Sequence, residues 1–314
     1  MQKPDFAAIK AASHRIKNFI HDTPVMSSSA IDEIAGCKLF FKCENLQKVG
    51  AFKMRGASNA VISLGEDELK KGVATHSSGN HAQALALAAK MAGAKAYIVM
   101  PENAPEVKVA AVKGYGAEIT FCKPTLAARE STLENIVAKT GASFIHPYND
   151  LRIITGQATA SYELHQHIGD LDFIVAPVGG GGLLSGTALV THYYQPNCKI
   201  IGAEPQGAND AWQSFHKGAI VPSVSPNTIA DGLLTSLGNL TFPIIKKYVK
   251  EILTVDDGTI SCAMQLIWER MKLIVEPSAA VPLAVILRNP QLFATKKVGI
   301  IISGGNVDLN KFFN

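Results

Sequence analysis

The sequence lacks the features that mark several large classes of protein. It has five cysteines but no C-x-x-C pair, so we expect neither a disulfide framework nor a zinc site but buried, reduced thiols. No run of Lys or Arg is longer than a pair, and the net charge is only +4, which argues against a nucleic-acid partner. A small anionic ligand suits this charge better. The cysteines are Cys37, Cys43, Cys122, Cys198 and Cys262.

No segment is expected to enter a membrane. The first 19 residues are charged throughout and have no apolar stretch before a small-residue cleavage site, so no secretory signal is visible. The uncharged run 173–190 contains Pro177 and four consecutive glycines, which would leave backbone groups unsatisfied in lipid. We therefore expect a cytoplasmic protein. The glycosylation pattern at Asn239-Leu-Thr241 is then a chance match.

What the chain does contain is enough apolar sequence for a large core, with 47% hydrophobic residues in 314. At about 150 residues per domain it should form two lobes. From Lys71 onward, short β-branched runs alternate with helical stretches that end at Gly93 and Gly116, which predicts a βαβαβ unit with a parallel sheet. The expected strands are 73–77, 96–100 and 118–122, and the expected helices are 81–93 and 104–116.

A second α/β unit follows later in the chain. A strand at 173–178 leads through glycines to a helix at 183–194 and a strand at 199–204, and residues 298–302 form another buried strand. Pro147 interrupts the pattern within 146–151, so we place the break between the lobes there. Ligands usually bind in the cleft between such lobes.

Four consecutive glycines, Gly179, Gly180, Gly181 and Gly182, are the strongest single feature. They lie between a buried strand and a helix start. Glycines let several backbone N–H groups converge on one oxyanion, and the helix N-terminus adds unpaired donors and a positive dipole end. A tight turn alone would explain one or two glycines but not four. We therefore predict a phosphate site.

A dinucleotide site is the alternative for this loop, since such a site also follows a strand with glycines and has an acid about 20 residues further on, where Glu204 stands. However, the register reads Gly180-x-Gly182-x-x-Ser185, with serine in place of the third small residue. No Gly-Lys-Ser/Thr follows, so the loop is not a Walker A motif. A lone phosphate ester fits better.

Lys53 is the second feature. It stands between Phe52 and Met54 at the opening of a helical stretch, 55–64. Most lysines are solvated surface residues. A helix N-terminus and partial burial both disfavour the ammonium form, so this amine is suited to forming a Schiff base.

Two loops complete the set. The segment Ser77-Ser78-Gly79-Asn80-His81 joins a strand to a helix, and its hydroxyls, amide and N–H groups can hold a carboxylate, although helix capping needs only one of them. Ser303 follows the apolar run 298–302, which places a hydroxyl at the carboxyl end of a central strand.

Together these segments resemble the fold-type II pyridoxal-phosphate enzymes, and within them the group of serine racemases, serine/threonine dehydratases and hydroxyaspartate dehydratases. The resemblance spans nearly the whole chain. It rests on FKCENLQKVGAFKMRGA, SSGNHAQAL, VGGGGLLSG, GAEPQGAND, TIADGL, ERMKLIVEPSA and IISGGNVDL, in that order. The biosynthetic threonine deaminases look more distant, because they carry a C-terminal regulatory domain and we expect none here.

The resemblance implies an α/β fold like that of the tryptophan synthase β-subunit, with two open twisted sheets, flanking helices and the site in the cleft. Residues 75–148 would form the small domain, and 1–74 with 149–314 the large, cofactor-binding one. It also implies a homodimer that acts on a small amino-acid substrate.

The same resemblance assigns roles to individual residues. Lys53 would bind the cofactor covalently, Phe52 would flank its ring and Asn80 would bind its 3′-oxygen. The phosphate would lie on Gly179 to Gly182, and Ser303 would face the pyridine nitrogen. The catalytic pair would be Lys53 and Ser78, on opposite faces of the ring. Ser77, Ser78, Gly79, Asn80 and His81 would bind the substrate carboxylate.

A divalent cation is implied at Glu204, Asp210 and the carbonyl of Ala208. Two carboxylates and a carbonyl are hard oxygen ligands suited to Mg²⁺, or else to Ca²⁺ or Mn²⁺. The alternative is a loop whose acids face solvent.

The expected reaction follows from Ser303. A hydroxyl cannot keep the pyridine nitrogen protonated as an aspartate does, so elimination is favoured over transamination. We expect loss of water from serine or threonine to give a 2-oxo acid and ammonia, and racemisation of serine through Lys53 and Ser78. The alternatives are a threo-3-hydroxyaspartate dehydratase, a β-replacement synthase of the cysteine-synthase kind, a nicotinamide dehydrogenase and a non-catalytic amino-acid sensor.

Overall fold

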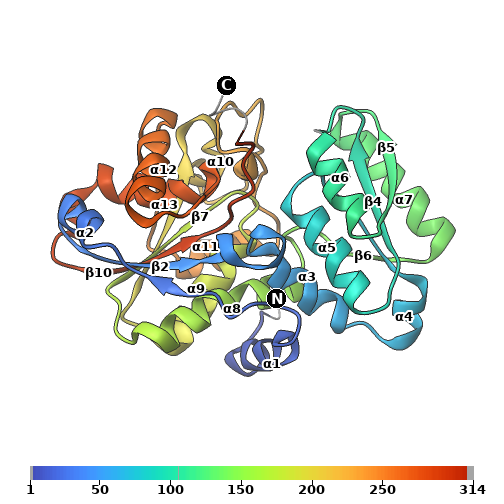
Figure 1. Ribbon diagram of the computed structural model, residues 1–314, viewed down its shortest axis with the longest axis horizontal. Coiled ribbons are helices and arrows are strands. Elements are labelled where there is room, and N and C mark those ends of the chain that lie inside the picture. The colour runs from blue at the N-terminus through green and yellow to red at the C-terminus, as the bar shows by residue number, and fades with distance from the viewer. Residues whose placement is uncertain (1–2, 105, 310–314) are drawn as a thin grey trace.

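The protein folds into two α/β lobes that lie side by side in the computed structural model, which describes residues 3–104 and 106–309 (Figure 1). One lobe is built on a six-stranded sheet and the other on a four-stranded sheet. No helix in the described part of the chain is long and apolar enough to cross a membrane.

The six-stranded sheet has the order β1-β2-β10-β7-β8-β9. All its neighbouring strands are parallel except β1, which pairs antiparallel with β2. Its inner strands are apolar on both faces, as in a sheet covered by helices on each side, and every residue of β7 is buried. The strands are β1 (Val25–Met26), β2 (Lys38–Cys43), β7 (Phe173–Pro177), β8 (Lys199–Pro205), β9 (Glu251–Val255) and β10 (Lys297–Ile302).

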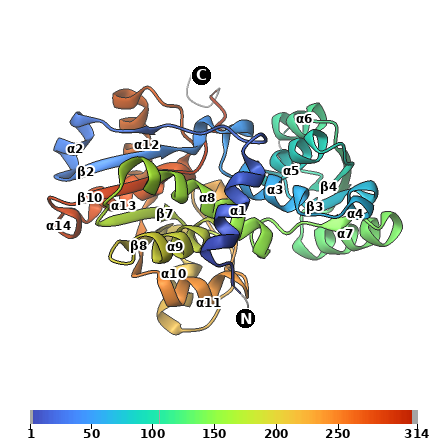
Figure 2. The ribbon, with the colours of Figure 1, turned by 90° about the horizontal axis from the view of Figure 1, so that it is seen from below.

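Helices cover both faces of this sheet. On one face lie α2 (Ser29–Ala35), α12 (Asp257–Met271) and α13 (Pro277–Arg288), whose apolar side chains share a core with the sheet. On the other lie α8 (Leu151–Ile168), α9 (Gly182–Tyr194) and α11 (Thr241–Tyr248). Helix α1 (Phe6–Ile16) packs outside α8, as Figure 2 shows. The short helix α10 (Asp210–Lys217) packs against β9 and α11, and α14 (Pro290–Phe293) packs against α13.

The four-stranded sheet is parallel throughout, in the order β5-β4-β3-β6. Alanine-rich α5 packs on one face and α7 on the other. The strands are β3 (Val73–His76), β4 (Ala96–Pro101), β5 (Glu118–Cys122) and β6 (Ser143–Phe144). The helices are α4 (Glu66–Lys71), α5 (Asn80–Met91), α6 (Glu106–Gly114) and α7 (Leu126–Thr140).

Helix α3 (Lys53–Ile62) joins the two lobes. It packs against α8 of the larger lobe and α5 of the smaller one. The approach to α8 is close enough to require glycine, because a Cβ on Gly156 would lie 2.6 Å from the carbonyl oxygen of Arg55. Lys53 is therefore the first residue of a helix held from both sides.

Beneath α3 lies a buried charge network, which we define as Arg55, Glu44, Glu163 and Lys42. Arg55 binds Glu44 through Nε at 2.7 Å, and both its terminal nitrogens bind Glu163 at 2.7 Å. Lys42 binds Glu163 at 2.6 Å. Two cations and two carboxylates balance, as buried charges require.

The α/β class and the parallel strand pairing are confirmed, and the expected strands and helices fall within a few residues of those observed. The expectation of buried thiols is wrong for Cys262, which is exposed because it lies on the outer side of α12; the other four are buried and all five are free. The division into domains at 75 and 148 stays a prediction. The four-stranded sheet itself begins at Val73.

Candidate functional site

The predicted segments meet where strands of the two sheets end. Ser303 directly follows β10, the glycines follow β7, and Ser77 follows β3. These are carboxyl ends of parallel strands, the edge at which open α/β sheets bind ligands. The contacts below link Ser303 and the glycine loop to the surroundings of Lys53.

The Lys53 side chain is partly buried at the start of α3. Its amine donates a hydrogen bond to the carbonyl of Pro147 at 2.9 Å and lies 5.1 Å from the centre of the Phe52 ring. Burial lowers the pKa of Lys53 to about 8, although the nearby Glu276 carboxylate acts in the opposite direction. A substantial fraction of this amine is therefore neutral near physiological pH.

Ser303 lies beside this lysine. The N–H of Phe52 donates to the carbonyl of Ser303 at 3.0 Å, and Ala51 forms a β-bridge with Gly304. Ser303 is 3% exposed. The structure thus brings Phe52, Lys53 and Ser303 together.

Asn80, the first residue of α5, is held by two residues of the larger lobe. Its amide nitrogen lies 3.1 Å from both carboxylate oxygens of Glu276, and its amide oxygen accepts from the side chain of Asn306 at 2.9 Å. The backbone N–H of Asn306 also donates to Glu276. Burial raises the pKa of Glu276 to about 7, with hydrogen bonds from Asn80 and Asn306 opposing it.

The four-glycine loop has no room for side chains. Gly181, the residue before α9, has a φ of +88°. Helix α9 has no side-chain cap, so its first amides remain without a capping side-chain acceptor. A Cβ on Gly180 would lie 2.3 Å from the ring of Tyr148, and one on Gly179 would lie 3.0 Å from Leu233. Close packing therefore explains part of the need for glycine. The backbone N–H groups at the N-terminus of α9 suit a phosphate.

The loop 77–81 lies at the start of α5. Ser77 accepts a hydrogen bond from the N–H of Gly79 at 3.3 Å, and Ser78 is half-buried. His81 is buried with its Nε2 at 3.2 Å from the Ile145 carbonyl, and burial lowers its pKa well below the usual value. Its ring is therefore neutral and packs within the small lobe. That Ser78 faces Lys53 stays a prediction.

Glu204 and Asp210 lie together and are both nearly inaccessible. The Glu204 carboxylate accepts from the N–H groups of Ala211 and Trp212 at 2.8 and 2.7 Å. Burial raises the pKa of Glu204 to about 8 and that of Asp210 to about 6. Ala208 is buried just before Asp210. These acids do not face solvent, contrary to the alternative considered for this loop.

The acids partly fit a hard cation. Both oxygens of Asp210 lack a hydrogen bond of ordinary length among the described residues, although the Ser223 side chain is near enough to lower the pKa of this acid. Across the same residues no group of three or more His, Cys, Asp or Glu side chains is arranged to hold a metal. A cation here would need the Ala208 carbonyl and water as further ligands.

Five residues at this site were not assigned from the sequence. Glu276 and Asn306 occur within segments that carried the resemblance, but nothing in the sequence indicated that they meet Asn80. His146, Pro147 and Tyr148 had been interpreted only as a break between lobes. Proline between two polar aromatic residues was the one signal that a shaped turn stands there.

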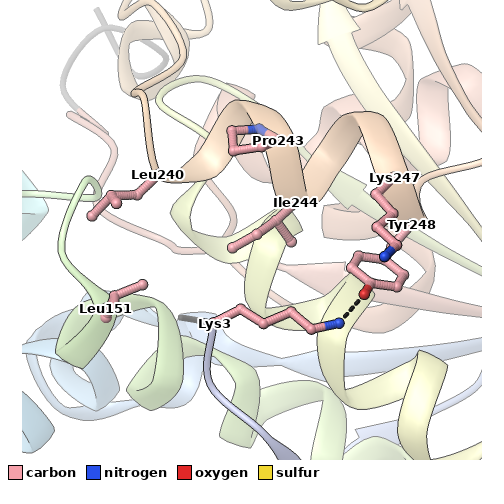
Figure 3. A pocket seen from close by; sticks show the side chains of 7 residues that line it. All are labelled: Lys3, Leu151, Leu240, Pro243, Ile244, Lys247 and Tyr248. Atoms are coloured by element: carbon pink, nitrogen blue, oxygen red, sulfur yellow. Dashed lines mark hydrogen bonds between the residues drawn. The ribbon is translucent and has the colours of Figure 1, made fainter. Parts of the chain in front are cut away.

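A separate shallow pocket of about 200 Å³ lies away from these residues (Figure 3). It lies between the N-terminal segment and α11 and is largely apolar with two lysines. It contains none of the predicted site residues. Its lining is Lys3, Leu151, Leu240, Pro243, Ile244, Lys247 and Tyr248.

The chain as a whole is similar to proteins of known activity. Residues 16–304 match the family described as pyridoxal-phosphate dependent enzyme. The chain is 54% identical to serine racemase of Dictyostelium discoideum over 96% of its length and 94% of that protein. It is 49% identical to beta-hydroxyaspartate dehydratase of Paracoccus denitrificans, over 99% of both. The crystal structure of the Dictyostelium serine racemase superposes with a TM-score of 0.94 at 53% identity, covering 97% of this chain and 99% of that one.

Proposed function

The chain belongs to the family of pyridoxal-phosphate dependent enzymes, and from this premise we propose that it racemises serine and dehydrates serine and threonine to 2-oxo acids and ammonia. The observation that carries the proposal is Lys53. Its amine is partly buried, has a pKa lowered to about 8 and is oriented by a hydrogen bond to the Pro147 carbonyl. These properties suit a lysine that binds a cofactor covalently.

The residues around Lys53 fit pyridoxal phosphate. Gly179 to Gly182 and the start of α9 would hold the phosphate, Asn80 the 3′-oxygen, and Ser303 the ring nitrogen, with Phe52 beside the ring. When bound, the cofactor withdraws electrons from the α-carbon of an amino acid and so acidifies its proton. A hydroxyl at Ser303, rather than a carboxylate, limits this withdrawal and favours elimination over transamination.

Lys53 is the proposed general base on one face of the substrate. Near pH 8 its amine is divided between neutral and charged forms, so it can both take the α-proton and return it. Ser78 would return a proton from the opposite face, which inverts the α-carbon. If the β-hydroxyl leaves instead, as water, the product hydrolyses to a 2-oxo acid and ammonia.

The loop 77–81 is proposed to orient the substrate. Its N–H groups lie at the start of α5, where the helix dipole favours a carboxylate, and Ser77 already shapes the loop by accepting from Gly79. The substrate carboxylate held there would place its α-carbon between the two proposed proton-transfer groups.

Three further properties belong to the proposal. A divalent cation, Mg²⁺ in the first place and otherwise Ca²⁺ or Mn²⁺, would bind at Glu204, Ala208 and Asp210, supported by the buried carboxylate oxygens of Asp210. A homodimer rests on the resemblance, and a cytoplasmic location on the five free thiols, which a reducing compartment maintains. A second candidate activity, dehydration of 3-hydroxyaspartate, is favoured by the 49% identity to a beta-hydroxyaspartate dehydratase.

The decisive experiment is borohydride reduction of the cofactor-loaded protein, followed by peptide mass mapping. We expect the label on Lys53; an unmodified Lys53 peptide would overturn the assignment. Formation of 2-oxo acid and of the opposite enantiomer should then be measured with serine, threonine and 3-hydroxyaspartate. Serine with sulfide separates a β-replacement synthase, which would release cysteine and little ammonia.

A further inference from the structure

The turn 146–149, between β6 and α8, contacts Lys53, the glycine loop and the segment 238–240. The Pro147 carbonyl accepts from the Lys53 amine, and the Tyr148 ring covers Gly180. The Asn149 side chain accepts from the N–H of Leu240 at 2.9 Å. The conformation of this turn therefore affects both Lys53 and the glycine loop, at the two ends of the proposed cofactor site.

The side chain of His146 accepts hydrogen bonds from the backbone of its own turn. Its Nδ1 lies 3.2 Å from the N–H nitrogen of Tyr148 and 2.9 Å from that of Asn149. Both partners are donors, so Nδ1 must accept, and the ring proton must be on Nε2. The imidazole is consequently neutral. Burial lowers its pKa to about 4, with His76 and Lys53 acting in the same direction and Asp150 against them.

One peptide group connects His146 to Lys53. The carbonyl of Pro147 and the N–H of Tyr148 belong to the same peptide unit, which is trans. In a planar trans peptide the C=O and N–H point in opposite directions. When His146 accepts the N–H on one side, the carbonyl is turned to the other side, where the Lys53 amine lies 2.9 Å away.

We propose that His146 is a positioning residue for Lys53: by accepting the Tyr148 N–H it aims the Pro147 carbonyl at the amine, and so fixes the amine whenever it is not covalently bound. This inference rests on the proposed role of Lys53 but goes beyond it. His146 need not touch substrate or cofactor. In cofactor-free protein, the Lys53 amine should therefore occupy a defined position only while Nδ1 of His146 accepts the hydrogen bond from Tyr148.

Substitutions at 146 can separate this role from general packing. Asn carries an acceptor, Oδ1, on the same γ-carbon that bears Nδ1 in histidine, and can replace it. Gln is closer to histidine in length but places its amide one bond further out, and Ala has no acceptor. His146→Asn should therefore keep the Lys53 amine in position, whereas His146→Gln should not.

The readout is the rate at which cofactor-free protein forms its imine with added pyridoxal phosphate, followed by absorbance. We expect His146→Ala and His146→Gln to load about tenfold more slowly than wild type, and His146→Asn to stay within about threefold, the scale set by one hydrogen bond. Equal rates for Asn and Gln variants of equal thermal stability, or a wild-type rate for His146→Ala, would overturn the proposal.

A measurement without substitution keeps the test independent of folding defects. In cofactor-free protein containing ¹⁵N-histidine, NMR at neutral pH should find no proton on Nδ1 of His146, and a proton there would refute the proposal. Failure of wild type to trap cofactor on Lys53 would instead reject the proposed function. The two failures are therefore distinguishable.

Discussion

The amide of Asn80 and the carboxylate of Glu276 are hydrogen-bonded across the two lobes, with the amide nitrogen 3.1 Å from each carboxylate oxygen. Asn80 begins a helix of the four-stranded lobe, and Glu276 precedes α13 of the six-stranded lobe. The side chain expected to bind the cofactor 3′-oxygen is thus oriented by the opposite lobe. The same carboxylate also acts on the Lys53 amine.

Replacement of Glu276 by Gln should therefore change the titration of Lys53. The carboxylate raises the pKa of Lys53 against the effect of burial, so its loss should move that pKa below about 8. The rate of imine formation in cofactor-free protein should then reach its half-maximum at lower pH than in wild type. Glu68→Gln, on the remote helix α4, serves as the control. An unchanged midpoint would contradict the coupling.

The same substitution should alter how stability depends on pH. The folded-state pKa of Glu276 is raised from 4.5 to about 7, so the folded protein binds this proton more tightly than the unfolded chain does. That contribution is fully present below pH 4.5 and is lost as pH rises toward 7. Wild type should lose stability over this interval relative to Glu276→Gln, as measured by urea unfolding at several pH values. Parallel pH profiles would refute the assignment.

Magnesium should raise the thermal midpoint of the protein, and more so at pH 8 than at pH 5. Protons compete for both carboxylates, because burial raises the pKa of Glu204 to about 8 and that of Asp210 to about 6. Asp210→Asn should abolish the rise, whereas Asp67→Asn, whose side chain is 90% exposed, should preserve it. The thermal midpoints should be measured at constant ionic strength, and EDTA should reverse the rise. A rise that persists in Asp210→Asn would place the cation elsewhere.

Ser78→Ala should separate the two proposed reactions. Without a proton donor on the second face, interconversion of L- and D-serine should fall at least about a hundredfold, the lower end of what one acid–base group contributes. Elimination from one enantiomer should continue, because Lys53 is intact. Chiral chromatography and 2-oxo acid assays on the same samples measure both. Ser131→Ala, at an exposed position on α7 of the same lobe, is the control. Equal loss of both reactions in Ser78→Ala would reject the two-face scheme.

Gly180→Ala should weaken cofactor binding by disturbing the Tyr148 ring. The added methyl would lie 2.3 Å from that ring, so the ring or the loop must move. Gly114→Ala is a matched control, because no heavy atom lies within 4 Å of its added methyl. We expect the affinity for pyridoxal phosphate, measured by titration of cofactor-free protein, to fall at least tenfold only in the first variant, a loss of about 1.4 kcal/mol. Equal affinities would show that the ring yields freely.

The parallel sheets and the start of α3 were predictable, because strand-length apolar runs, glycine stops and the position of Lys53 are local signals. The site was predictable only in part. Ser303 and the glycine loop follow strands that the pattern reveals, so their edge of the sheet could be inferred. Glu276 could not be placed beside Asn80, since 196 residues separate them and only the packing of two lobes brings them together. His146 was missed for a related reason: its function lies in a ring nitrogen that accepts from its own turn, which composition does not reveal.

The buried charge network determines how the protein loses activity on heating. Arg55 lies two residues after Lys53 on one rigid helix, and its guanidinium is sealed between Glu44 and Glu163. If heat or mutation removed either carboxylate, the two cations of the network would face one carboxylate, and an uncompensated positive charge would remain in the interior. The reactive amine therefore sits on the same cooperative unit as the core of the fold. Inactivation by warming should coincide with melting rather than precede it.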